Sequence, residues 1–147
     1  MHFWDQHKTI TSYYELLARE VCDTYQLTQM EYDILMFLHS NQQYNTAADI
    51  VKIRKSTKSH VSSSLKDLEK KGLVERIQSA DNKKHIEINL LSKAEPIVEA
   101  GLKAQRQFAR NVLSGLSEEE KTVCISVFQK ICNNANEFLK KEKEREV

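Results

Sequence analysis

The residues best suited to chemistry lie between positions 52 and 84, which we call the basic segment. It holds ten lysines and arginines against four acidic residues, a net charge of +6 in a chain whose total is +1. One basic block on an otherwise acidic chain indicates a surface that binds a polyanion. From charge alone, an ordinary solvated face is an equal alternative.

Small polar side chains stand inside the basic segment, in the run Ser59-His60-Val61-Ser62-Ser63-Ser64. Val61, Leu65 and Leu68 recur at spacings of four and three, which predicts a helix that turns these residues inward. Short hydroxyl groups on the opposite face allow such a helix to lie deep in a DNA groove and contact bases or phosphates. Ser64 is the exception, because a step of 100° per residue turns it toward the body of the protein.

Helices are expected almost everywhere else along the chain. Apolar spacing predicts a helix over about 5–24, and Thr28 with Glu31 forms a capping box that opens a helix ending near Ser40. Similar cap patterns are expected at Thr46 with Asp49, Ser92 with Glu95, and Ser117 with Glu120. The remaining helices are expected over 46–53, 57–71, 92–113 and from 117 toward the C-terminus.

A change of period marks one strand pair. Ile86, Ile88 and Leu90 alternate with polar residues, which is typical of a half-buried strand. Residues 73–79 and 85–91 are therefore expected to pair as an antiparallel hairpin with a basic tip. The fold is predicted to be mostly α with this small hairpin, as one domain over 1–147 that contains a winged helix-turn-helix.

The sequence resembles the MarR family of bacterial transcription regulators. The resemblance lies in the run from Ser62 to Arg76, which reads SSSLKDLEKKGLVER, in the wing Asp81-Asn82-Lys83-Lys84, and in the helix start Leu91-Ser92-Lys93-Ala94. Lysines stand where this family has wing arginines, and lysine keeps the charge without the planar fork. The resemblance implies a DNA-binding lobe over 28–91, and a helical dimerisation region over 1–27 and 92–147.

Contacts with double-stranded DNA are expected from the recognition helix and the wing. Lys70 and Lys71 precede Gly72 at a helix C-terminus, where cations are favourable in any case, so a structural role is at least as plausible for both. For Arg76, a salt bridge to Asp81 and a phosphate contact are both open. The expected DNA-binding residues are Lys55, Thr57, Lys58, Ser59, His60, Ser62, Ser63, Lys66, Arg76, Lys83 and Lys84.

The resemblance also implies a homodimer that represses transcription and releases DNA when a small-molecule effector binds. The effector would lie between the dimerisation helices and the DNA-binding lobe. The residues that would line its site are Tyr13, Tyr14, Leu17, Phe37 and His39. No cofactor and no metal ion are expected, since residues 92–113 contain no histidine.

Three cysteines, Cys22, Cys124 and Cys132, lack the spacing of a zinc ribbon or a disulfide framework. They are expected to be small buried hydrophobes in a reducing compartment. Cys22 stands three residues before Tyr25, which leaves a redox-sensing regulator open as an alternative. A reactive cysteine would need a lowered thiol pKa.

Enzymatic activity is not expected. The sequence has no nucleophile elbow, phosphate-binding loop or HExxH motif, and only three glycines. It shows neither a secretory signal nor an apolar run that could span a membrane, so a cytoplasmic protein is expected. The main alternative is an adaptor of the same fold that does not bind DNA, although such a protein would not need to concentrate charge in the basic segment.

Overall fold

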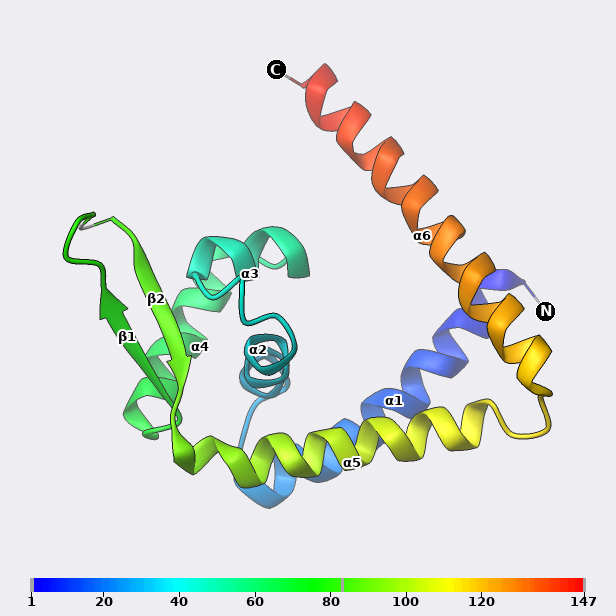
Figure 1. The fold of residues 1–147 in the computed structure, drawn as a ribbon, viewed down its shortest axis with the longest axis horizontal. Helices are drawn as coiled ribbons and strands as arrows, with labels where there is room; N and C mark the ends of the chain where they lie inside the picture. Colours follow the sequence, from blue (N-terminus) through cyan, green and yellow to red (C-terminus); the bar gives the residue numbers. More distant parts are fainter. Residues whose placement is uncertain (1, 83, 147) are drawn as a thin grey trace. The chain divides into compact units, whose positions relative to one another are not determined.

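The computed structural model describes residues 2–82 and 84–146, and it has the predicted element order (Figure 1). Contacts divide the chain into two compact units, residues 1–108 and residues 109–147. The elements are α1 (Phe3–Tyr25), α2 (Gln29–Ser40), α3 (Ala47–Arg54), α4 (Lys58–Lys70), β1 (Val74–Gln78), β2 (Ile86–Leu90), the 3₁₀ turn η1 (Ser92–Ala94), α5 (Glu95–Val112) and α6 (Glu118–Arg145).

Two predicted capping boxes open α2 and α3. The hydroxyl oxygen of Thr28 accepts from the Glu31 N–H at 3.1 Å, and Glu31 Oε1 accepts from the Thr28 N–H at 3.0 Å. Thr46 and Asp49 repeat both bonds, at 3.1 and 3.2 Å. Each box satisfies two backbone donors that the first helical turn would otherwise leave unpaired, so these four residues fix where α2 and α3 begin.

The capping box predicted at Ser92 and Glu95 is wrong. Ser92 begins η1, whose N-cap is Leu91, and no side chain caps this turn. The Leu91 N–H donates to Leu73 O, and the Ala94 N–H donates to Leu91 O, both at 2.9 Å. The path out of β2 is therefore fixed by backbone hydrogen bonds, which leave no capping position for the Ser92 hydroxyl.

The core of the first unit lies between α2, α4 and the base of the hairpin. Tyr32 and Leu35 of α2 are fully buried, as are Leu65 and Leu68 of α4. Helix α5 approaches α2 closely at Gly101, where a Cβ atom would lie only 2.5 Å from Met36 Sδ. A larger residue at this position would therefore require the Met36 side chain to move.

Strands β1 and β2 pair antiparallel, from Val74 opposite Leu90 to Gln78 opposite Ile86. The Ile88 N–H donates to Asn45 O at 2.7 Å, and Thr46 forms an isolated bridge with Glu87. The loop before α3 therefore pairs with the middle of β2. These bonds hold the wing and the start of α3 together.

Helix α6 has no buried residue, although it carries a long apolar stripe. Its exposed side chains include Cys124 and Cys132, whereas Cys22 in α1 is buried. The prediction that all three cysteines are buried is therefore wrong for two of them, because they lie on a helix that has no buried residue. Neither α6 nor any other described helix combines the length and apolar character that a bilayer-spanning segment needs.

Candidate nucleic-acid interface

A tight connection presents the N-terminus of α4. Lys55, the C-cap of α3, has a left-handed backbone with φ 53°, and the Ser56 N–H donates to Val51 O at 3.2 Å. Thr57 then caps α4, because its hydroxyl oxygen accepts from the His60 N–H at 3.4 Å. Three residues therefore join α3 to α4, the arrangement of a helix-turn-helix.

The outer face of α4 is polar and small, as the helical spacing predicts. Ser59, His60, Ser63 and Lys66 are exposed, and Ser62 is half-buried. Ser64 is buried beside the inward apolar residues, as expected. The outer face of α4 therefore carries short hydroxyl groups beside one imidazole and one ammonium group.

A groove of about 580 Å³ separates α3 and the start of α4 from β2. Lys52, Lys58 and Lys84 bring positive charge to it from three different elements or their connections. Its other lining residues are Thr46, Ala47, Ala48, Val51, Ser62, His85 and Ile86. Ammonium groups around a groove between a polar helix and a wing suit the phosphodiester backbone of a nucleic acid. Lys83, also expected to bind DNA, lies outside the described residues.

Three basic residues of the basic segment form ion pairs with acidic residues of the same chain. Arg76 Nε lies 2.6 Å from Glu69 Oε2, so its partner in the structure is Glu69 and not Asp81. Arg54 pairs with Asp33 at 2.8 Å. The third, Lys71, pairs with Glu31 at 2.7 Å, which places it among the structural residues. Sequence reasoning missed all three acidic partners, since no local pattern links them to the basic residues.

Residues 25–85, from the end of α1 to the wing, match the model of the MarR family. Over this segment, the chain is similar to the MarR family. No match was found among curated proteins.

Solved structures with the MarR fold align over nearly the whole chain. A complex of MepR from S. aureus with DNA is 24% identical, with a TM-score of 0.77, over 91% of this chain and 96% of that one. A MarR family protein from Bacillus stearothermophilus is 25% identical, with a TM-score of 0.72, over 90% and 91%. MarR itself is 15% identical, with a TM-score of 0.77, over 94% and 93%.

The residues that the MarR resemblance suggested for an effector site have different surroundings in the structure. Leu17 and Phe37 are core residues, 5% and 6% exposed. Tyr13 and Tyr14 place their rings against Phe108, with centroids 5.8 and 5.3 Å from it.

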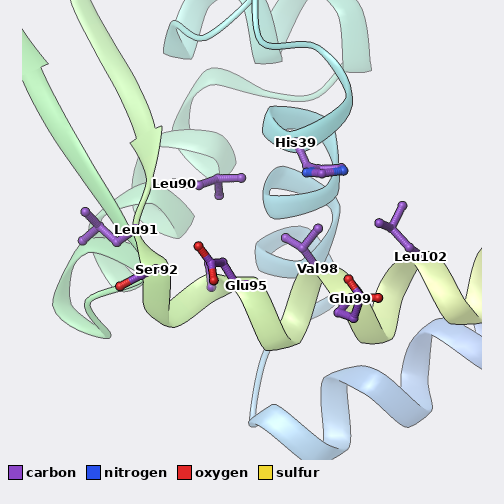
Figure 2. A pocket seen from close by; sticks show the side chains of 9 residues that line it. His39, Leu90, Leu91, Ser92, Glu95, Val98, Glu99 and Leu102 are labelled. Atoms are coloured by element: carbon purple, nitrogen blue, oxygen red, sulfur yellow. The ribbon is translucent and has the colours of Figure 1, made fainter.

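His39 lines a pocket of about 430 Å³ formed by α2, the end of β2 and the start of α5. Figure 2 shows the His39 side chain on α2 and those of Val98 and Leu102 on α5 around this space. The other lining residues are Leu90, Leu91, Ser92, Ala94, Glu95 and Glu99.

Cys22 has the environment of a structural cysteine. Burial, followed by the charge of nearby Asp33, raises the pKa of its thiol. Its Sγ lies 3.8 Å from Thr28 O. A raised pKa disfavours the thiolate that a redox sensor needs, so this environment argues against redox sensing. Within residues 2–82 and 84–146, no three histidine, cysteine or acidic side chains are grouped to hold a metal ion.

Proposed function

We propose that this chain is a sequence-specific, DNA-binding transcriptional regulator that acts as a homodimer on a pseudo-palindromic operator. The observation that carries the proposal is the outer face of α4, with its short hydroxyl groups beside the lysine-lined groove that leads to the wing. The major groove of DNA admits one α-helix, and a neighbouring wing reaches the backbone or the minor groove. The DNA complex of MepR, which shares this fold, supports the same mode of binding.

The proposed DNA contacts fall into two groups, base contacts and phosphate contacts, according to side-chain chemistry. Ser59, His60, Ser62 and Ser63 of α4 are proposed to face base edges, where short polar groups read sequence. Phosphate contacts, which position the protein on the duplex, are proposed for the longer or flanking side chains. These are Lys55, Thr57, Lys58, Lys66, Lys83, Lys84 and Arg76, the last through a guanidinium that already pairs with Glu69.

A second copy of the chain is the proposed partner of the outer helices. Val123, Phe128, Ile131 and Phe138 of α6 are between 46% and 66% exposed, and Trp4 of α1 is 76% exposed. Apolar surface of this extent marks an interface. A two-fold dimer would also place two recognition helices at half-sites about one helical turn apart.

A ligand-responsive repressor that acts in the cytoplasm is the finer proposal. The pocket at His39 is the proposed effector site, because it adjoins both α5 and the end of β2, and β2 is one of the two strands of the hairpin. A ligand there could change how the DNA-binding lobe is held.

A salt titration tests DNA binding directly. The duplexes are the region upstream of the protein's own coding sequence and a random sequence of equal length. We expect affinity to fall steeply with salt and to favour the upstream duplex. Lys84→Ala should reduce the slope of log affinity against log salt by about two units, since one phosphate contact is lost from each subunit of the dimer. Lys103→Ala, which removes an exposed lysine of α5, is the matched control and should leave the slope unchanged.

Absence of binding even at low salt would overturn the proposal. The adaptor of the same fold would then be favoured, with the basic segment facing an acidic protein. A steep salt dependence without preference for the upstream duplex would retain DNA binding but refute the proposed operator there.

A further inference from the structure

A nearly buried carboxylate lies under the C-terminal end of the recognition helix α4. Glu31 is 2% exposed, and its Oε2 accepts a hydrogen bond from Lys71 Nζ at 2.7 Å. Its other oxygen completes the capping box of α2. Burial favours the neutral acid, but hydrogen bonds from Lys71 and Thr28 hold the pKa of Glu31 below its usual range. Glu31 is therefore ionised at neutral pH, and both of its carboxylate oxygens accept hydrogen bonds.

Lys71 joins the ends of four elements at this point. Its ammonium group also donates to Gln26 O, the left-handed cap of α1, at 3.0 Å. Its own carbonyl oxygen accepts from Lys93 Nζ, in the turn before α5, at 2.9 Å. Lys71 itself is the C-cap of α4. The end of the recognition helix is thus bonded to α1, α2 and the approach to α5.

These bonds hold the end of α4 close to its neighbours and also set the direction in which the chain leaves the helix. Gly72 follows with φ 73° and turns the chain toward β1, so Lys71 is the last helical anchor before the wing. Breaking one partner of a buried ion pair leaves a charge without compensation, whereas apolar side chains of similar volume often replace the whole pair at no cost in stability. The effect of the Lys71–Glu31 pair on the orientation of α4 is therefore more informative to test than its effect on stability.

We propose that Lys71 and Glu31 are positioning residues for DNA recognition, which fix α4 to the outer helices and thereby set the half-site spacing that the dimer accepts. This rests on the proposed function, since the outer helices α1 and α5 would determine where each lobe stands in the dimer. A recognition helix that is bonded to them cannot pivot to follow a displaced half-site. Without those bonds, α4 would adapt to several spacings.

The test uses three duplexes that carry the operator, located by footprinting on the upstream DNA. One has the native spacing, and the others have one base pair added or removed between half-sites, which rotates one half-site by about 35°. Wild-type protein should bind both altered duplexes at least about tenfold more weakly than the native one. Lys71→Met should lose most of this discrimination, and Lys71→Arg should restore it because arginine keeps the donor.

Lys70→Met is the matched control, since it removes the same charge from an exposed neighbour on the same turn. It should weaken binding to all duplexes equally and keep the discrimination. Equal discrimination by Lys71→Met and Lys70→Met would overturn the inference. If Lys71→Met fails to fold, Glu31→Gln takes its place with the same expected loss, and unchanged discrimination by Glu31→Gln would overturn it equally. A wild-type protein that binds no duplex would instead refute the proposed function.

Discussion

The serines of α4 show how the two faces of one helix can serve different purposes. Serine is a weaker helix former than alanine or leucine, so the run from Ser59 to Ser64 gives α4 little intrinsic stability. Burial of Val61, Leu65 and Leu68 against the core holds the helix instead. The inward face therefore supplies the stability, so the outward face can carry the small polar side chains that the proposed DNA contacts need.

Glu31 gives a pH prediction at the same scale. Because its pKa is lowered in the folded protein, its ionised form stabilises the fold at pH values above the unfolded pKa of about 4.3. This contribution is lost as the pH falls through the lower, folded pKa. Glu31→Gln should lower the free energy of unfolding by about 1–3 kcal/mol near neutral pH. The deficit should shrink below about pH 4, where the wild-type carboxylate also becomes protonated.

Urea unfolding at neutral and acid pH measures both differences. Glu75→Gln, at an exposed position of β1, removes a charge of the same kind and should show no comparable deficit at neutral pH. A deficit for Glu31→Gln that stays constant with pH would contradict the interpretation, because it would then reflect lost packing and not lost charge.

At the scale of elements, Gly101 lies where α5 comes close to α2. A Cβ atom at position 101 would lie 2.5 Å from Met36 Sδ and 3.2 Å from Tyr32 Cε2. Gly101→Ala should therefore destabilise the protein by about 1–3 kcal/mol, despite the better helix propensity of alanine. Denaturant unfolding of Gly101→Ala, Met36→Ala and the double variant measures the coupling. The double variant should lose less stability than the two single losses together, and strict additivity would contradict the steric explanation.

Local pattern predicted the elements well and their long-range pairings poorly. The apolar spacings and the boxes at Thr28 and Thr46 are short-range signals, and each lies where the structure has a helix. The box at Ser92 failed because backbone bonds between Leu91 and Leu73, eighteen positions apart in the sequence, decide the path there. Ion pairs such as Lys71 with Glu31, forty positions apart, leave no local signal. The sequence alone therefore indicated the polar outer face of α4 and missed the contacts that hold this helix in place.

At the scale of the whole molecule, the apolar stripe of α6 should control assembly. Phe128 is 55% exposed, so an added carboxylate there should cost little in the isolated chain. In a dimer it would be buried without a partner, which is strongly unfavourable. Phe128→Asp should therefore be monomeric in sedimentation at concentrations where the wild-type protein is dimeric, and its affinity for the full operator should fall more than about tenfold.

Gln129→Asp separates the effect of assembly from the effect of charge. A step of 100° per residue places Gln129 on the side of α6 opposite the apolar stripe, so the same added charge should leave the dimer and its operator affinity intact. Binding to an isolated half-site should be similar for the wild type and both variants, because the contact residues in each lobe are unchanged. A monomeric Phe128→Asp that still bound the full operator like the wild type would contradict the dimeric mode of binding. The proposed selection of half-site spacing would then fail as well, since only two recognition helices linked in a dimer can distinguish one spacing from another.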